Sequence, residues 1–392
     1  MKNSIPQHIL PVIVVAQFAG TSLWFAGNAV VDDLIRELNL LEMFIGFITM
    51  AVQSGFIIGT LVFAFLNIAD RFSPVKVFLF CALAGSVCNL STIWSTNFTE
   101  VMFTRLFTGF FLAGIYPAGM KIASDWHKES LGKALGYLVG ALVVGTAFPH
   151  LLKFMGGDYS WKFVLIGTSI FASVGGVLLF LTVKDGPHRT HSKGLVFEYD
   201  AIIKLFKIRN FRSAAFGYFG HMWELYTFWA FVPVILSVYI ASNQGMDFDV
   251  SLLSFLIIGI GGVSCAIGGH FSLTIGSKKV SMIALVGSGV CCLLLPFSLG
   301  LPVLIFLSIL FLWGVFVIPD SPQFSTMVAK SCDSKYIATG LTIVNSLGFA
   351  LTIVSIQLVN LLYTETGSVN VFWIMLIGPA LGLLAIRAYQ TE

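Results

Sequence analysis

Long apolar runs separated by short polar stretches follow one another along the whole chain. Residues 163–183 and 280–297 are typical, since neither run contains a charged side chain or a regular alternation of apolar and polar positions. A helix that crosses the hydrocarbon needs about 20 apolar residues, whereas a strand of a membrane barrel needs about ten with alternating polarity. The pattern therefore predicts an all-α membrane protein. We expect twelve transmembrane helices, near residues 9–31, 43–66, 75–94, 101–121, 132–152, 161–183, 212–240, 250–273, 279–298, 301–319, 337–361 and 369–388.

Composition excludes the soluble alternatives. The chain has 392 residues, of which 57% are hydrophobic and 10% charged, whereas soluble domains carry about 25% charged residues. An ordinary soluble enzyme and a disordered chain are both excluded, because neither combines high hydrophobicity with so few charges. The first apolar run reaches Asp32 and Asp33 without a small-residue cleavage site. We therefore expect it to remain as the first span rather than to be removed as a signal peptide.

Lysine and arginine are concentrated in alternate loops. When both termini are placed in the cytoplasm, eighteen of these residues fall on the cytoplasmic side, and only Arg36, Lys153 and Lys162 fall on the outer side. Cytoplasmic loops of membrane proteins carry such an excess, so both termini are expected to be cytoplasmic. The net charge of +3 is then a consequence of topology, and it gives no support to nucleic-acid binding.

The longest polar loop separates six expected helices from six. We expect an N-terminal six-helix bundle over residues 1–183, a cytoplasmic linker over 184–211 and a C-terminal six-helix bundle over 212–392. The second part of the linker mixes apolar and basic residues at a spacing that predicts an amphipathic helix on the cytoplasmic membrane surface; these residues are Ile202, Ile203, Lys204, Leu205, Phe206, Lys207 and Arg209.

The two halves repeat one another in sequence. Lys76 corresponds to Lys279 at an offset of 203 residues. Glycines correspond at nearly the same offset: Gly20 with Gly220 at 200, Gly59 with Gly262 at 203 and Gly136 with Gly340 at 204. Parallel repeats about an axis along the membrane normal occur in transporters, where the binding site lies at the repeat interface near the midplane. We therefore expect a binding cavity between the halves.

Two strings carry a family resemblance. The segment between expected helices 2 and 3 is Leu66-Asn-Ile-Ala-Asp70-Arg71-Phe-Ser-Pro-Val-Lys76, and helix 4 contains Arg105-Leu-Phe-Thr-Gly109. With twelve helices in two halves, these strings resemble the major facilitator superfamily, whose loop has the form Gly-x-Leu-Ala-Asp-Arg-x-Gly-Arg-Lys. Both glycines are lost here and the charged trio is kept. The resemblance implies alternating access, a gate at Asp70, Arg71 and Lys76, and a place among bacterial members in the inner membrane.

A carboxylate inside the seventh expected helix is the strongest candidate for transport chemistry. Glu224 lies about twelve residues into the span at 212–240, roughly 18 Å along its axis. A charge in the hydrocarbon costs at least about 2.5–3.5 kcal/mol on insertion scales, so a functional role is the first expectation. His221 precedes Glu224 by one helical turn on the same face. Because burial disfavours the charged form of both side chains, we predict that they are a proton-coupling pair; a structural pair joining neighbouring helices is the alternative.

Two further charged residues leave alternatives open. Arg105, near the outer end of helix 4, is expected to bind a substrate anion or modulate a proton site, or else to pair with Glu100 or a backbone carbonyl. Asp320, near the inner end of helix 10, is either a second gate residue or a charge at a hydrated helix end, and the second interpretation is favoured.

By the family resemblance, helices 1, 4, 7 and 10 line the cavity. Aromatic walls with a few polar groups suit an organic solute better than a bare ion. Tryptophan and tyrosine also fill packing gaps and form interface belts in membrane helices, which is the alternative for each of them. The candidate cavity residues are Trp24, Asn28, Arg105, Tyr116, Trp223, Tyr226, Trp229 and Trp313.

These observations predict a secondary transporter that moves a small organic solute with protons. The chain lacks the phosphate-binding loop of ATP-driven transporters. The alternatives are a proton-antiporting exporter of lipophilic compounds, such as drugs or siderophores, and a membrane sensor that does not transport. We expect no enzymatic activity, cofactor or metal, because no catalytic or zinc-binding spacing is found, and we expect a monomer surrounded by membrane lipids.

Overall fold

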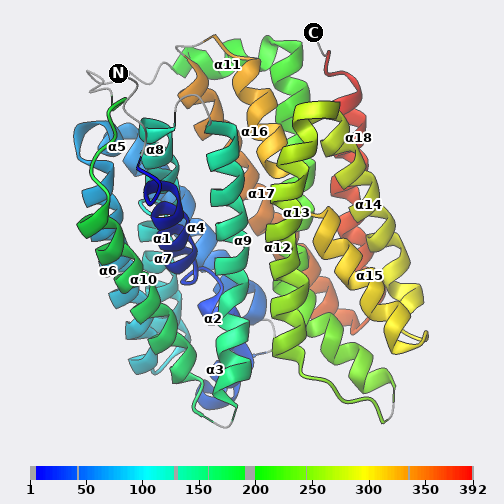
Figure 1. Ribbon diagram of the computed structural model, residues 1–392. Helices are drawn as coiled ribbons and strands as arrows, with labels where there is room; N and C mark the ends of the chain where they lie inside the picture. Colours follow the sequence, from blue (N-terminus) through cyan, green and yellow to red (C-terminus); the bar gives the residue numbers. More distant parts are fainter. Residues whose placement is uncertain are drawn as a thin grey trace. The chain divides into compact units, whose positions relative to one another are not determined.

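The computed structural model describes residues 6–41, 44–127, 131–157, 159–189, 199–243, 245–333 and 336–390. Helices make up most of these ranges, and the described residues form no strand (Figure 1). Eleven helices in the described ranges are long and apolar enough to cross a membrane, and a shorter apolar helix, Ile9–Thr21, precedes them. The prediction of an all-α membrane protein with twelve spans is therefore confirmed.

The chain divides into two compact units. Unit 1 comprises Met1–Leu41 and Ala51–Val196. Within it, α1 packs against α8, α9 and α10, and α6 packs against α7, α8 and α10. Its helices are α1 (Ile9–Thr21), α2 (Ala26–Ala29), α3 (Val31–Leu38), most of α4 (Phe44–Phe65), α5 (Ile68–Arg71), α6 (Pro74–Ser91), the 3-10 turn η1 (Thr92–Trp94), α7 (Phe98–Leu112), α8 (Tyr116–Trp126), α9 (Leu131–Gly156) and α10 (Lys162–Thr182).

Unit 2 comprises Glu42–Met50 and Phe197–Glu392. Its longest helix, α12, packs against α13, α16, α17 and α18. The helices are α11 (Tyr199–Lys207), α12 (Arg209–Ser242), α13 (Val250–Ile275), α14 (Ser277–Ser298), α15 (Val303–Phe316), α16 (Ser321–Lys330), α17 (Ile337–Thr366), the 3-10 segment η3 (Val369–Leu376) and α18 (Ile377–Arg387).

A short helix occurs where the linker pattern predicts one. In α11, Leu205 is buried and Ile203 is exposed. Phe206 lies 5.2 Å, between ring centroids, from Phe211 of α12. Some apolar residues of this helix are therefore buried or in contact with α12, and others are exposed. The side chain of Ile202 lies outside the described residues.

Three of the expected spans are broken. The first consists of α1, α2 and α3; the fourth of α7 and α8; and the tenth of α15 and α16. Both α8 and α16 carry a proline in their first turn, where the missing N–H removes no helical hydrogen bond. The expected ends at residues 121 and 319 are wrong, because α8 continues to Trp126 and α16 to Lys330. In both cases the apolar run ends before the helix does.

The internal repeat is visible in matching contacts of the two units. In unit 1, a Cβ atom on Gly109 of α7 would overlap the carbonyl oxygen of Val52 in α4. In unit 2, a Cβ atom on Gly314 of α15 would overlap the carbonyl oxygen of Ile257 in α13. Glycine allows two helix backbones to approach closely in a membrane. The same close helix crossing therefore occurs at equivalent positions of both units.

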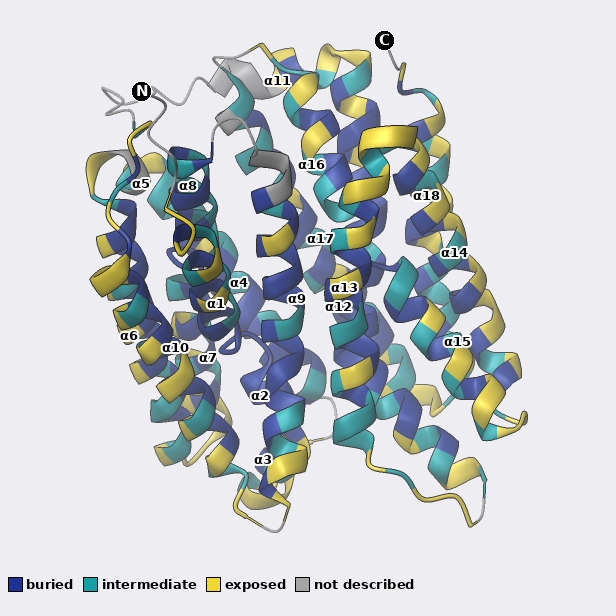
Figure 2. Ribbon diagram, in the orientation of Figure 1, coloured by how far each residue is buried: buried dark blue, intermediate teal, exposed yellow. Residues whose placement is uncertain are grey.

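Exposed apolar side chains recur at helical intervals. Figure 2 shows exposed positions along α6, α10 and α14. They include Phe80, which is 65% exposed, and Leu181, which is 74% exposed. Large exposed apolar surfaces mark contact with a membrane or a partner, and lipid is the natural occupant along helices of spanning length.

The close crossing at Gly314 predicts a stability difference between two glycine substitutions in unit 2. Gly314→Ala forces a methyl group onto the Ile257 carbonyl, and overpacking of this kind costs about 1–3 kcal/mol. A Cβ on Gly269 meets no atom within 4 Å, so Gly269→Ala should be neutral or stabilising by up to about 1 kcal/mol through helix propensity. Melting of the purified variants by fluorescence-detected size exclusion checks this, and equal melting temperatures would contradict it.

Candidate functional site

Glu224 is the centre of a buried polar cluster in unit 2. It lies in α12 and is 1% exposed. One carboxylate oxygen, Oε1, accepts a hydrogen bond of 2.8 Å from Nε1 of Trp313 in α15. The other, Oε2, accepts a hydrogen bond of 2.9 Å from Oγ of Ser288 in α14. Side chains from three helices therefore meet at this carboxylate, and the Trp313 indole is itself stacked on Phe228 at 4.3 Å between centroids.

The predicted partner of Glu224 pairs with a different carboxylate. Nδ1 of His221 lies 2.9 Å from Oδ1 of Asp320, and both side chains are at most 2% exposed. The other ring nitrogen of His221 has no hydrogen-bond partner among the described residues. His221 and Glu224 belong to one cluster, but they contact different helices.

Asp320 corrects an expectation. It lies between α15 and α16 and is 1% exposed, so its interpretation as a charge at a hydrated helix end is wrong. The reason is that the apolar pattern stops near this residue while the helix resumes at Ser321 and continues to Lys330. The break places Asp320 inside the unit rather than at its edge.

The three aromatic residues that flank Glu224 in sequence make different contacts. Nε1 of Trp223, which is half-buried, donates a hydrogen bond of 2.9 Å to the carbonyl oxygen of Ile374 in η3. Tyr226 and Trp229 are buried with ring centroids 5.2 Å apart. Trp223 therefore fastens α12 to η3, and a contact of Tyr226 or Trp229 with solute stays a prediction.

Arg105 is the central buried cation of unit 1 and is 0% exposed. Its Nη1 donates to Oδ1 of Asn89 at 2.6 Å, and its Nη2 donates to the carbonyl oxygens of Leu23 at 2.8 Å and Trp24 at 3.1 Å. Those carbonyls lie in the break between α1 and α2. Of the expected alternatives, the backbone contact is the one observed. The Glu100 carboxylate instead accepts hydrogen bonds from Thr96.

The remaining cavity candidates of unit 1 lie in the break after α1, in α2 and at the start of α8. Trp24 is 1% exposed and Asn28, in α2, is 7% exposed. The ring centroid of Trp24 lies 4.7 Å from that of Phe56 in α4. Tyr116 is half-buried at the start of α8. Their contact with a solute stays a prediction.

Two buried glutamines were not among the site residues predicted from the sequence. Gln17 of α1 and Gln53 of α4 are both 0% exposed, and neither atom of either amide has a hydrogen-bond partner among the described residues. A polar amide within an apolar span was the available signal, because such residues are costly in hydrocarbon unless they are bonded.

The expected gate residues lie at an exposed end of unit 1. Arg71 and Lys76 are exposed, and the side chain of Asp70 lies outside the described residues. Ser73 caps α6 by accepting a hydrogen bond from the Lys76 backbone. Its hydroxyl donates to Asp185, beyond the end of α10, at 2.7 Å. This loop is therefore tied to the segment that follows α10, and gating stays a prediction.

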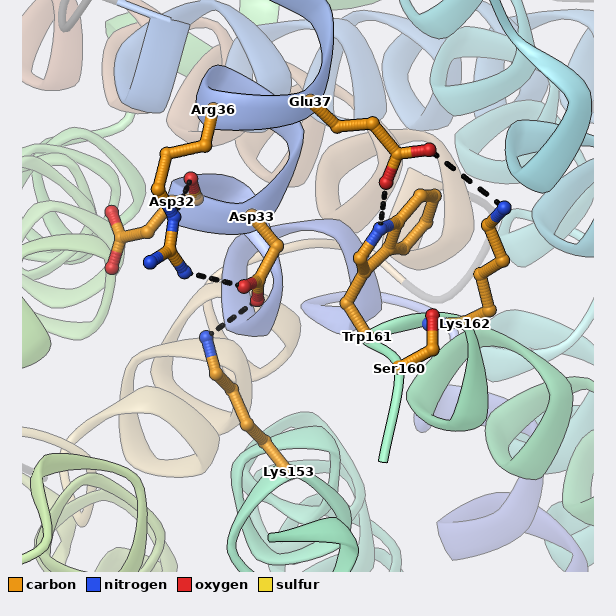
Figure 3. A network of polar contacts seen from close by, with 8 residues as sticks. All are labelled: Asp32, Asp33, Arg36, Glu37, Lys153, Ser160, Trp161 and Lys162. Atoms are coloured by element: carbon orange, nitrogen blue, oxygen red, sulfur yellow. Dashed lines mark hydrogen bonds and ion pairs between the residues drawn. The ribbon is translucent and has the colours of Figure 1, made fainter. Parts of the chain in front are cut away.

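The three basic residues expected on the outer side are all paired with carboxylates of α3 (Figure 3). Asp33 accepts contacts from Arg36 at 2.6 Å and from Lys153 at the end of α9 at 2.9 Å. Glu37 lies 3.7 Å from Lys162 at the start of α10 and accepts a hydrogen bond from the Trp161 indole. The network joins α3 to the ends of α9 and α10.

Comparison with known proteins identifies a family model that matches most of the chain and relatives that match parts of it. The family model described as Major Facilitator Superfamily matches residues 12–356. The nitrate/nitrite transporter NrtP of Nostoc punctiforme is 23% identical over 45% of this chain and 36% of its own length. The 3-(3-hydroxy-phenyl)propionate transporter of Escherichia coli is 26% identical over 43% of this chain and 40% of its own length. The chain thus matches less than half the length of each of these relatives.

A solved structure shows the same fold. A mutant of the nucleoside transporter NupG superposes with a TM-score of 0.72, covering 97% of this chain and 98% of that one at 15% sequence identity. The likeness extends over nearly the entire chain of both proteins.

The bonding of Arg105 predicts that it stabilises unit 1. Arg105→Met leaves the Leu23 and Trp24 carbonyls and the Asn89 amide oxygen without their donor, and each buried unsatisfied group costs about 1–3 kcal/mol. Melting of the purified protein should show a large loss for this variant and a smaller loss for Arg105→Lys, which keeps a cationic donor. Arg36→Met is the matched control, because that side chain is 75% exposed. An Arg105→Met protein as stable as the control would contradict the assignment.

Proposed function

The chain belongs to the Major Facilitator Superfamily, and we propose that it is a secondary transporter that moves a small organic solute by alternating access with coupling to protons. In this proposal Glu224 is the residue that binds the transported proton. The transporter resides in a bacterial inner membrane with both termini in the cytoplasm, as the distribution of lysine and arginine favours.

The burial of Glu224 is the observation that carries the proposal. The carboxylate is 1% exposed, and its described hydrogen bonds come from the neutral donors Ser288 and Trp313. Among the described residues, neither lysine nor arginine forms an ion pair with it. A carboxylate without a cation in a dehydrated site is far less costly when it is protonated. Proton binding while the site is closed, and release when it opens to water, follow from this difference.

The relatives are compatible with a small-molecule substrate. The names of two of them specify nitrate or nitrite and a hydroxyphenyl propionate. In this chain, Tyr226 and Trp229 supply buried aromatic surface near Glu224 in sequence, which suits an organic solute. We therefore keep a small organic solute as the proposed class.

An exporter of lipophilic compounds is the second candidate. A buried acidic residue among aromatic side chains favours it. The Gly-Pro pair that is typical of antiporters of this family is absent from α9, where Phe148 precedes Pro149, and this absence disfavours the exporter. A sensor that has lost transport is the third candidate, and flux of any solute excludes it.

Transport by reconstituted protein tests the role of Glu224. Proteoliposomes with an imposed pH gradient are supplied with organic acids, amino acids, nucleosides, siderophores and lipophilic cations, and solute flux is recorded with the luminal pH. The wild type should accumulate one solute class while the gradient dissipates. Glu224→Gln should lose gradient-driven accumulation to the level of empty liposomes but keep exchange of the same solute between the two sides.

The matched control is Glu365→Gln, which removes an exposed carboxylate of α17 in the same unit and should transport normally. Unchanged gradient-driven accumulation by Glu224→Gln would refute proton coupling through this residue. Movement of lipophilic cations against the proton flow would establish the exporter instead.

A further inference from the structure

The two units make the same helix contact with different chemistry. In unit 1, Gly20 of α1 lies against Ile115, in the break between α7 and α8. In unit 2, His221 of α12 lies against Asp320, in the break between α15 and α16. The sequence repeat relates α1 to α12 at an offset of 200, through Gly20 and Gly220. The prolines that begin α8 and α16 relate the two breaks in the same manner.

The fold does not require a charged pair at this helix contact, because unit 1 forms the contact without one. In unit 1, the equivalent contact is made by Gly20 and Ile115, neither of which is ionisable. Ile115 is 0% exposed and Gly20 is buried, so the contact is closely packed without charge. A buried acid and histidine at the equivalent place cost free energy unless they are paired. Architecture alone therefore gives no reason for the His221–Asp320 pair.

The surroundings of the pair connect it to Glu224. Asp320 and Glu224 are the two carboxylates of the cluster, since His221, which contacts Asp320, precedes Glu224 by about one turn of α12. Three buried cysteines lie on neighbouring helices of the unit, Cys265 on α13 and Cys291 and Cys292 on α14. Thiols in apolar surroundings are neutral near neutral pH, so they do not balance the carboxylates.

The rings that flank His221 complete these surroundings. They are Tyr218, at 5.9 Å between centroids, and Phe324 of α16, at 6.4 Å. From α17, Ser355 bonds Thr227 rather than the cluster. His221 is therefore the cationic group available to the two carboxylates among the described side chains that face them.

We propose that His221 and Asp320 form a second proton-binding pair that titrates together with Glu224. This inference rests on the proposed function and extends it from one residue to three. With both carboxylates ionised and the imidazole protonated, the cluster carries one net negative charge. One further proton, transferred from hydronium to a carboxylate oxygen with release of water, makes the cluster neutral. The neutral state is the one suited to a dehydrated interior, and strongly interacting groups of this kind bind protons as a unit.

The break between α15 and α16 allows a conformational change to alter the His221–Asp320 contact. Asp320 is held at the junction of α15 and α16, while Glu224 is bonded to Trp313, on α15 itself. A change of angle at the junction therefore alters the distance of Asp320 from His221 separately from the Trp313–Glu224 bond. Proton binding at one carboxylate and the geometry of the other are linked through α15.

Infrared spectroscopy tests the proposal without a solute. The carbonyl stretching band of protonated carboxylic acids is followed by attenuated total reflection while the pH of the reconstituted protein is varied. The wild type, Glu224→Gln, Asp320→Asn and the control Glu365→Gln are compared. Glu224→Gln and Asp320→Asn should each remove one titrating component, and each should displace the midpoint of the other by about one pH unit or more. His221→Gln should displace both.

The result that overturns the proposal is an Asp320 that contributes no titrating band, together with a Glu224 band whose midpoint is unchanged in Asp320→Asn. If Asp320→Asn does not fold, the double variant His221→Thr/Asp320→Ile replaces it, because it makes this contact uncharged, as it is in unit 1. A displaced Glu224 midpoint in that variant supports the proposal, and an unchanged one refutes it. Coupled titration without solute flux would refute the transport function alone, whereas proton-driven flux with independent titration would refute this inference alone.

Discussion

Hydrocarbon offers no hydrogen-bond partner, and this constraint governs the polar interior of both units. In unit 1, the break after α1 frees the carbonyl groups of Leu23 and Trp24, and the Arg105 guanidinium donates to both. In unit 2, Ser288 and Trp313 donate to the Glu224 carboxylate. Arg105 is thus bound by two backbone carbonyls in addition to Asn89, whereas the described hydrogen bonds of Glu224 come from side chains of other helices. The hydrogen bonds of Arg105 stabilise the fold of unit 1, whereas those of Glu224 change when the helices that carry its partners move.

The same scaffold therefore serves two purposes in the two units. Matching glycine crossings, at Gly109 and Gly314, show that their helices are assembled alike. The buried ionisable groups differ: the guanidinium of Arg105 closes a helix break in unit 1, and the acids of unit 2 gather with His221 around another break. The proposed proton-dependent step of transport is accordingly placed in unit 2.

Periodicity and depth were enough to predict the helices, the repeat and the burial of Glu224, because long apolar runs have one stable arrangement in a membrane. The partners of Glu224 were not predictable in the same manner. His221 shares its helix with Glu224, yet it contacts Asp320 at the junction of α15 and α16. Glu224 instead contacts Ser288 of α14 and Trp313 of α15. Asp320 was misplaced because α16 extends beyond the apolar run. Contacts between helices depend on packing angles and breaks, which hydropathy does not encode.

In the proposed mechanism, solute binding is linked to protonation of Glu224. A thermal-shift titration of the purified protein with solute at several pH values measures this linkage. A solute that binds the folded protein raises its melting temperature according to its affinity. We expect one hydrophilic solute class to stabilise the wild type with an affinity that changes with pH. Glu224→Gln should retain binding but lose the pH dependence, since binding and protonation are reciprocally linked. The same pH dependence in wild type and variant would contradict it.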